Sequence, residues 1–292
     1  MTSPESRNDG QTIFISGAGA GLGRTYAMQL AQEGANLILN DIDAQACEET
    51  RALVEKAGAR SLVEICDVTD AAAVEAAVAA SAEHFGRIDG VVCNAGSLRD
   101  RTFAKMPLED FRFIVEVHLM GTVNLLKPIW PIMLAQGYGR VVLTTSTSAL
   151  YGNFGQSNYD AAKLGIVGLC KSLALEGAKS GVTVNCIAPV AYTRLGEGIF
   201  PEALRPRLGT AHISRLVCYL LSRSGGDTTS KIIEVGGGKI ALAKTMRTDF
   251  VSLRTEGDET QTIRALAAID PTQAPPSARE AFTAHLEAAL EG

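Results

Sequence analysis

Short apolar runs alternate with longer helical patterns along most of this chain. The apolar runs predict seven strands, at Thr12–Ser16, Asn36–Asn40, Ser61–Cys66, Ile88–Cys93, Gly139–Ser146, Val182–Ile187 and Lys231–Val235. Between them, helical patterns end at Glu33 and cover Asp43–Gly58, Ala71–Phe85, Leu108–Gln136, Ser157–Lys179 and Ala211–Ser222. Strands that alternate with helices form a parallel sheet covered on both faces, and right-handed crossovers make it doubly wound. We therefore predict an α/β fold of the Rossmann type.

Polar residues follow several of the predicted strands. In an open parallel sheet, ligands bind beyond the carboxyl ends of the strands. The residues at those ends that we expect on one edge are Ser16, Asp41, Asp67, Asn94 and Ser146.

The chain changes character after its last predicted strand. Gly236–Gly238 closes that strand, and the following tail is richer in basic residues and prolines. The segment Ser277–Leu290 has the pattern of a terminal helix, with Ser277 as its cap. We expect one domain over residues 1–292, with a core at 10–238, an extension at 239–292 and a substrate-side loop at Tyr192–Leu208.

Composition excludes several classes of protein. The formal net charge of −5 gives no general affinity for nucleic acid, which favours a basic surface. The six cysteines form no C-x-x-C pair, so we expect reduced core thiols and no metal site. No uninterrupted apolar stretch reaches about 18 residues, and the ends carry neither a secretory pattern nor a peroxisomal address. These features predict a cytoplasmic protein without a membrane or nucleic-acid partner.

The first strand runs into a glycine-rich turn, Gly17-Ala18-Gly19-Ala20-Gly21-Leu22-Gly23, and a helix follows. Glycines let the backbone approach a pyrophosphate, and the helix N-terminus supplies N–H groups to it. Asp41 follows Gly17 by 24 residues, which suits a carboxylate on an adenosine ribose. A carboxylate there repels a 2′-phosphate, so the sequence predicts NAD rather than NADP.

Tyr159 and Lys163 lie four residues apart and would share one face of a helix. A phenol ionises near pH ~10, and a neighbouring ammonium lowers that pKa. A tuned tyrosine can then take a proton from an alcohol, with Ser146 holding the same oxygen. A buried tyrosine beside a lysine with a solvated head is the alternative interpretation.

Several motifs together resemble the short-chain dehydrogenase/reductase family. They are Ser16-Gly17-x3-Gly21-x-Gly23, Asn94-Ala95-Gly96, Ser146 and Tyr159-x3-Lys163. Further segments are similar to one branch, the (3R)-hydroxyacyl-CoA dehydrogenase domains of peroxisomal multifunctional enzymes: Leu98–Phe103, Tyr151–Gln156, Ala188-Pro189 and Glu234–Gly238. The hydratase and sterol-carrier domains of such enzymes find no room here, so we expect a stand-alone dehydrogenase.

The resemblance implies a role for each matching residue. Tyr159 would be the acid/base, Lys163 would lower its pKa, and Ser146 would hold the substrate oxygen. The implied NAD contacts are Ser16, Gly17, Gly21, Leu22, Gly23, Asp41, Asp67, Val68, Asn94, Gly96, Tyr159, Lys163, Pro189 and Thr193. The chain departs from the family pattern at His118, where many relatives carry Asn, and at Pro189-Val190 in place of Pro-Gly. Because a His in an apolar helix is usually a core residue, we leave His118 outside the catalytic set.

The resemblance favours oxidation of a 3-hydroxyacyl-CoA to a 3-ketoacyl-CoA with NAD, within lipid metabolism. Arg99, Arg101, Lys105 or the cations of the tail would meet the CoA phosphates, unless these residues form only a solvated surface. A hydroxysteroid dehydrogenase acting on a free sterol is an alternative. A non-catalytic dinucleotide-binding or scaffold protein is another, since fold alone does not fix function. Two long apolar helices predict a homodimer or homotetramer.

Overall fold

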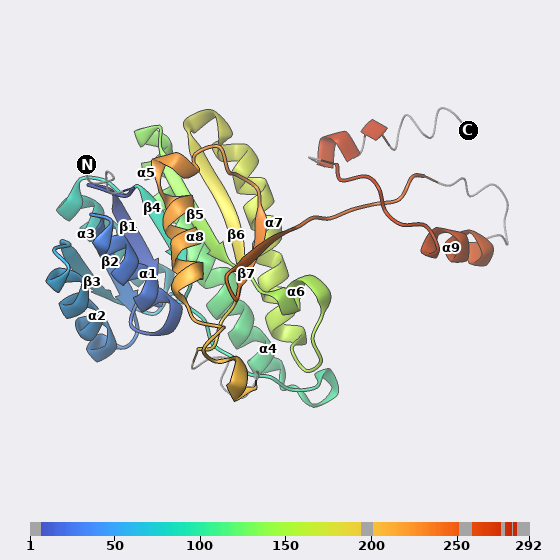
Figure 1. Ribbon diagram of the computed structural model, residues 1–292, viewed down its shortest axis with the longest axis horizontal. Helices are drawn as coiled ribbons and strands as arrows, with labels where there is room; N and C mark the ends of the chain where they lie inside the picture. Colours follow the sequence, from blue (N-terminus) through green and yellow to red (C-terminus); the bar gives the residue numbers. More distant parts are fainter. Residues whose placement is uncertain (1–6, 194–200, 251–258, 276–277, 282, 285–292) are drawn as a thin grey trace. The chain divides into compact units, whose positions relative to one another are not determined.

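The computed structural model describes residues 7–193, 201–250, 259–275, 278–281 and 283–284 (Figure 1). The chain divides into two compact units, Met1–Leu242 and Ala243–Gly292. That the second unit is an extension of a single domain stays a prediction.

The first unit is built on an eight-stranded sheet. The strands are β1 (Thr12–Ser16), β2 (Asn36–Asp41), β3 (Ser61–Ile65), β4 (Gly90–Cys93), β5 (Gly139–Thr144), β6 (Val182–Val190), β7 (Ile232–Gly236) and β8 (Lys239–Ala243). Their spatial order is β3-β2-β1-β4-β5-β6-β7-β8, and every pair from β3 to β7 is parallel. The strand order reverses at β1, which pairs with both β2 and β4 and is buried along its whole length. A ligand crevice is expected at such a reversal, and the predicted fold class is confirmed.

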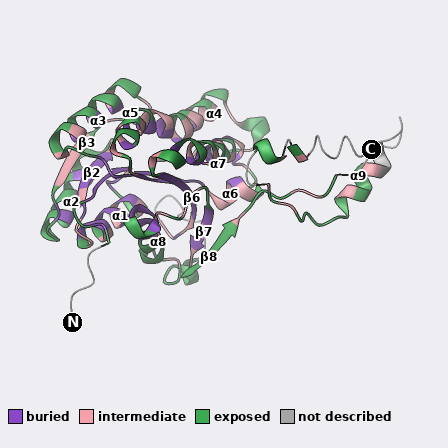
Figure 2. Cartoon of the chain, turned by 90° about the horizontal axis from the view of Figure 1, so that it is seen from above, coloured by how far each residue is buried: buried purple, intermediate pink, exposed green. Residues whose placement is uncertain are grey.

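Helices cover both faces of the sheet (Figure 2). They are α1 (Gly21–Gln32), α2 (Ala44–Lys56), α3 (Ala71–Phe85), α4 (Leu108–Val115), α5 (Gly121–Gln136), α6 (Thr147–Tyr151), α7 (Ser157–Gly177) and α8 (Ala211–Leu221), with α9 (Glu259–Ala267) in the second unit. Single 3₁₀ turns lie at Phe103–Lys105, Ala178–Ser180, Glu202–Leu204 and Arg223–Gly225. The helices α1, α2 and α8 lie on one face of the sheet, and α3, α4, α5 and α7 lie on the other. A π-helical turn, Glu116–Met120, joins α4 to α5, so the long helix predicted at Leu108–Gln136 is nearly continuous.

The region after β7 differs from the prediction. Gly237 and Gly238 have φ of 56° and 74°, which a two-residue hairpin turn requires at both positions. Because two residues can connect only antiparallel neighbours, β8 returns antiparallel beside β7 at the edge of the sheet. The predicted helix Ser277–Leu290 lies mostly outside the described residues, as does part of the predicted loop Tyr192–Leu208.

The six cysteines are unpaired, and all except Cys66 are buried, as predicted. No helix within the described ranges is both long enough and apolar enough to cross a membrane.

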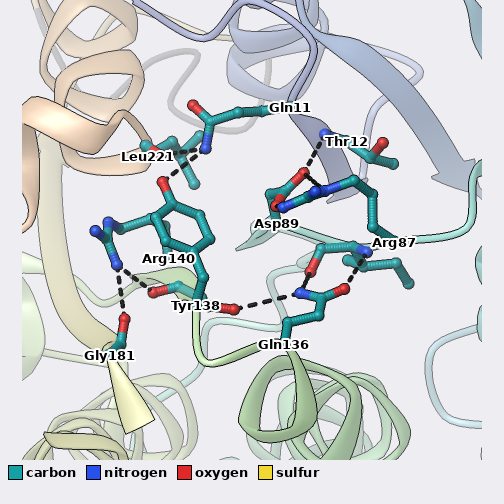
Figure 3. Close-up of polar contacts among 11 residues, drawn as sticks. Gln11, Thr12, Arg87, Asp89, Gln136, Tyr138, Arg140, Gly181 and Leu221 are labelled. Atoms are coloured by element: carbon teal, nitrogen blue, oxygen red, sulfur yellow. Dashed lines mark hydrogen bonds and ion pairs between the residues drawn. The ribbon is translucent and has the colours of Figure 1, made fainter.

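The amino-terminal edge of the sheet is closed by side chains that bond to the backbone (Figure 3). Gln136 pairs with both backbone groups of Ile88, donating from Nε2 at 2.9 Å and accepting at Oε1 at 3.1 Å. Gln11 donates from Nε2 to the hydroxyl of Tyr138 at 2.7 Å, and Arg140 donates from Nη1 to the carbonyl of Gly181 at 2.9 Å. These side chains occupy the backbone groups at this edge, so the opposite edge is the place where we look for a ligand.

Candidate active site

The glycine-rich turn between β1 and α1 lacks space for a side chain at several of its positions, of which Gly17 and Gly23 show the closest backbone approach. Gly17 has φ of 66°, and a Cβ on it would lie 2.9 Å from Cα of Ala95. A Cβ on Gly23 would lie 2.0 Å from the carbonyl oxygen of Gly17. The close approach of these backbones forms the cradle that a pyrophosphate needs, and the φ of 54° at Gly21 turns the chain into α1.

The N-terminus of α1 is not capped by a side chain. Asp43 accepts from the N–H of Ala46 at the start of α2, and Asp70 caps α3 in the same way. The N-cap of α1 is Ala20, which has no side chain that could bond to the first turn. The N–H groups of that turn therefore remain available to an anion, so the residues present fit a dinucleotide pyrophosphate.

Arg24 supports this turn, although no motif in the sequence singles it out. Its guanidinium donates to the carbonyl of Gly19 from Nε at 2.9 Å and from Nη2 at 2.6 Å, and it pairs with Glu49 at 2.9 Å. The only sign of this role in the sequence is the position of Arg24, one turn into the helix that follows the glycines. The partners of its guanidinium are determined by the fold.

Asp41 stands at the end of β2 and contacts the glycine turn directly. Its Oδ2 accepts from the N–H of Gly19 at 3.0 Å, and its Oδ1 accepts from the N–H of Ile42 at 2.8 Å. Two carboxylate oxygens offer about four acceptor positions, so capacity remains for ribose hydroxyls. The predicted ribose residue and the predicted pyrophosphate turn are thus physically joined.

Ser16 and Asn94 join the ends of β1 and β4. The Oγ of Ser16 accepts from the N–H groups of Asn94 at 3.1 Å and Ala95 at 3.2 Å. The side chain of Asn94 donates from Nδ2 to the carbonyl of Gly17 at 3.3 Å. These bonds tie the Asn94-Ala95-Gly96 segment to the glycine turn.

Asp67 and Val68 follow β3, as predicted. Asp67 accepts at Oδ1 from the N–H of Thr69 at 2.9 Å, which forms a local turn. The carbonyl of Val68 accepts from Nδ2 of Asn124 at 2.9 Å, and a Cβ on Gly121 would lie 2.7 Å from the side chain of Val68. The fold therefore holds this segment against the start of α5.

A cavity of about 340 Å³ opens beside these strand ends. The predicted site residues that line it are Leu22, Asn94, Gly96, Ser146, Tyr159, Lys163, Pro189 and Thr193. The remaining predicted residues lie at the glycine turn and at the ends of β1, β2 and β3, and they do not line the cavity: Ser16, Gly17, Gly21, Gly23, Asp41, Asp67 and Val68. The wall also contains residues that the predicted site set lacks, among them Leu98, Thr144, Asn153 and Gln156.

The structure brings Ser146, Tyr159 and Lys163 together. Ser146 caps the short helix α6, accepting from the N–H of Ser148 at 3.3 Å. Lys163 follows Tyr159 by one turn of α7, and its Nζ lies 5.7 Å from the centroid of the Tyr159 ring. That Nζ donates to the carbonyl of Thr144 at 2.7 Å. The lysine head is therefore held in the site and not in solvent, which contradicts the alternative interpretation.

Burial has the largest effect on the pKa values of Lys163 and Tyr159. It lowers the pKa of Lys163 to about 8, although the thiols of Cys186 and Cys93 act in the opposite direction. Burial also raises the pKa of Tyr159 above its ordinary value, and a hydrogen bond with Ser146 offsets this only in part. The expected lowering of the tyrosine pKa is thus wrong for this structure, because loss of solvent disfavours the phenolate.

His118 lies in the cavity wall, against the ring of Tyr159. Its ring meets the Tyr159 ring edge-on, with centroids 5.0 Å apart at an angle of 90°. Burial lowers the pKa of His118 to about 3, so the ring is neutral. Its Nε2 lies 2.7 Å from the carbonyl oxygen of Ser97 and 3.2 Å from the backbone nitrogen of the same residue, while Nδ1 has no partner among the described residues. A Cβ on Gly96 would lie 2.5 Å from Cε1 of His118, so the glycine is needed beside it. His118 is the core residue that we expected, but it also contacts the site.

Comparison with known proteins agrees with this geometry. A family model described as short chain dehydrogenase matches residues 11–197. A protein of Mycobacterium tuberculosis, named as a short-chain type dehydrogenase/reductase, is 41% identical over 79% of this chain and 83% of its own length. The peroxisomal multifunctional enzyme type 2 of Mus musculus is 40% identical over 85% of this chain, which spans 34% of that longer enzyme. The crystal structure of a carveol dehydrogenase from Mycobacterium avium in complex with NAD has a TM-score of 0.74 and 28% identity, over 80% of this chain and 98% of that one. This chain belongs to the short-chain dehydrogenase family and is an oxidoreductase.

Proposed function

We propose that the protein oxidises the hydroxyl group of a 3-hydroxyacyl-CoA to a ketone, with NAD as the hydride acceptor. The observation that supports this substrate class is that two segments pack together beside the cavity. We name these segments, residues 99–106 and residues 153–158, the rim loops. Gln156 donates from Nε2 to Oδ2 of Asp100 at 2.7 Å, and the N–H of Arg101 donates to the carbonyl of Gly155 at 2.8 Å. Asn158 donates from Nδ2 to the carbonyl of Arg99 at 3.1 Å.

The rim loops overlap the segments Leu98–Phe103 and Tyr151–Gln156, which resemble the hydroxyacyl-CoA branch of the family. They lie far apart in the sequence, yet three hydrogen bonds hold them together beside the cavity. The similarity to a peroxisomal multifunctional enzyme over 85% of this chain supports the same substrate class. The two segments therefore act as one structural unit, as a shared substrate surface requires.

NAD is the cofactor. The cradle at Gly17 and Gly23, the uncapped α1 and the carboxylate of Asp41 fit its diphosphate and its adenosine ribose. The Mycobacterium avium neighbour was solved with NAD. When bound, NAD accepts hydride from the substrate carbon and brings a positive charge to the site. We assign the contacts to the residues named for NAD in the sequence analysis.

The chain's own residues would handle the proton and the oxygen. Ser146 would donate a hydrogen bond to the substrate oxygen. Tyr159 would take the hydroxyl proton as the hydride leaves, acting as general base. Lys163, protonated at neutral pH because its pKa is about 8, would favour the phenolate of Tyr159 in competition with burial.

The test is a substrate panel with NAD. A 3-hydroxyacyl-CoA and a free hydroxysteroid are compared by the appearance of NADH absorbance. The proposal expects turnover of the CoA thioester. Turnover of the steroid alone would instead identify a hydroxysteroid dehydrogenase, and turnover of neither would refute both substrate assignments.

Tyr159→Phe provides the control for the chemistry. It should lower kcat by at least about a hundredfold, a typical contribution of a general base, while NAD still binds. Tyr138→Phe is the matched variant, because Tyr138 lies at the closed edge of the sheet and bonds to Gln11 (Figure 3). That variant should keep its kcat. Undiminished turnover in Tyr159→Phe would refute the assigned role.

The assembly and the location also belong to this proposal. We infer a homodimer or homotetramer and a cytoplasmic location. Light scattering of the purified protein tests the first, and cell fractionation tests the second.

A further inference from the structure

The rim loops expose two aromatic rings. Phe154 is 88% exposed and Phe103 is 75% exposed. Phe154 follows Asn153, which lines the cavity, and Phe103 begins the 3₁₀ turn Phe103–Lys105. Large exposed apolar side chains beside a cavity are typical of a surface that a ligand covers.

The backbone beneath these rings is fixed. The three bonds between the rim loops hold it, and Asn153 adds one from its Nδ2 to Oε1 of Gln156 at 2.8 Å. The rings therefore sit on a defined platform beside the cavity mouth.

The same loops carry three cations, and the structure separates their roles. Arg99 pairs with Asp110 at 2.6 Å and lies 3.8 Å from the ring centroid of Phe113, so its charge is already neutralised. Arg101 and Lys105 are exposed and form no ion pair with any acid in the described part of the chain. The carboxylate of Asp100, which lies nearest in sequence, accepts from Gln156. Two unpaired cations beside two exposed rings, in a chain of net charge −5, match an anionic ligand that has an aromatic group.

We propose that Arg101, Lys105, Phe103 and Phe154 bind the phosphorylated adenosine part of the CoA thioester. This inference rests on the proposed function and extends it to the outer part of the substrate. The acyl group enters the cavity toward Ser146 and Tyr159, and the CoA arm leaves along Asn153 and Gln156. The adenine stacks on the exposed rings, and the phosphates meet the two cations.

The test compares two thioesters of the same 3-hydroxyacyl group, one with CoA and one with pantetheine, which lacks the nucleotide. In the double variant Arg101→Ala/Lys105→Ala, KM for the CoA thioester should rise at least about tenfold, a loss of about 1.4 kcal/mol. The kcat, and the KM for the pantetheine thioester, should stay within about twofold of wild type. Phe154→Ala should raise KM for the CoA thioester alone. Lys56→Ala/Arg215→Ala is the matched control, because it removes two exposed cations from α2 and α8.

Calorimetric titration with CoA, at saturating NAD, separates this inference from the proposed function. The wild type should bind CoA, and the double variant should bind it at least about tenfold more weakly. If neither thioester is oxidised but CoA binding follows this pattern, the binding surface stands and the reaction is wrong. Turnover of the CoA thioester with an unchanged KM in the double variant overturns the binding surface alone, and so does a wild type that does not bind CoA.

Discussion

Replacement of Lys163 by methionine should remove a pH-dependent cost to folding that the active site imposes. Lys163 is only 3% exposed, and burial lowers its pKa from 10.5 to about 8. Below pH 8 the amine is protonated in both the folded and the unfolded protein, but its charge is disfavoured in the folded one. At about 1.4 kcal/mol for each unit of pKa, this burial costs about 3 kcal/mol at pH 7.

The sign of the pH dependence follows from proton counting. Between pH 8 and 10.5 the folded protein releases this proton while the unfolded chain retains it, so wild-type stability gains a contribution that rises with pH. By pH 10 about 2.5 kcal/mol of the cost is gone. The Lys163→Met variant has no buried amine and therefore lacks this cost at every pH. It also loses the hydrogen bond to Thr144, which is worth about 1–2 kcal/mol. The free energy of unfolding of the variant, minus that of wild type, should therefore fall by about 2.5 kcal/mol between pH 7 and pH 10.

Urea unfolding followed by circular dichroism, at pH 7, 8, 9 and 10, measures this difference. The thiol of Cys47 also contributes to the pH dependence, because burial raises its pKa to about 12 and it ionises in this range only in the unfolded chain. This contribution is the same in both proteins and cancels in the difference. Turnover is measured in parallel and should be lost in the variant. A difference that stays constant within about 0.5 kcal/mol across the pH range would show that Lys163 carries no such cost.

Three further substitutions test the geometry of the site. Asp41→Asn keeps an acceptor for the N–H of Gly19 but removes the charge that opposes a 2′-phosphate, so the ratio of kcat/KM with NAD to that with NADP should fall at least about tenfold; an unchanged ratio would mean that Asp41 does not read the ribose. Gly23→Ala places a Cβ 2.0 Å from the carbonyl oxygen of Gly17, so the Kd for NAD should rise at least about tenfold by titration calorimetry; an unaltered Kd would contradict the cradle. Gly96→Ala places a Cβ 2.5 Å from His118 and should push that ring against Tyr159, lowering kcat. The added change His118→Asn should restore part of the kcat, and a failure to do so would place the damage elsewhere.

The sequence predicted the elements that bury a regular apolar face. The strands β1 to β7 and their helices followed from alternation, because each parallel strand is a short apolar run and each covering helix has its own period. The strand β8 was missed because its residues are almost all exposed, so no buried pattern marks it. The helix α6 was missed because five residues are too few for a period and its start depends on the cap from Ser146.

The candidate site was predicted as a set of residues but not as a set of contacts. The motifs named Ser146, Tyr159 and Lys163, and the fold brought them together. The bond from Asp41 to the glycine turn could not be read from the chain, because its other partner is a backbone group. The pKa of Tyr159 was predicted in the wrong direction, because the ammonium was visible in the sequence and the burial was not.

The two edges of the sheet show why the carboxyl edge is the site. At the amino edge, Gln136 satisfies both backbone groups of Ile88 (Figure 3). At the carboxyl edge, α1 starts without a capping side chain, and Lys163 uses one of its three donors, on Thr144, among the described residues. Buried donors that the protein does not pair cost stability, so they persist where a ligand supplies the acceptors. Ribose hydroxyls and phosphate oxygens of a dinucleotide are such acceptors. The stability cost of burying Lys163 then follows from the need to keep its donors free for the ligand.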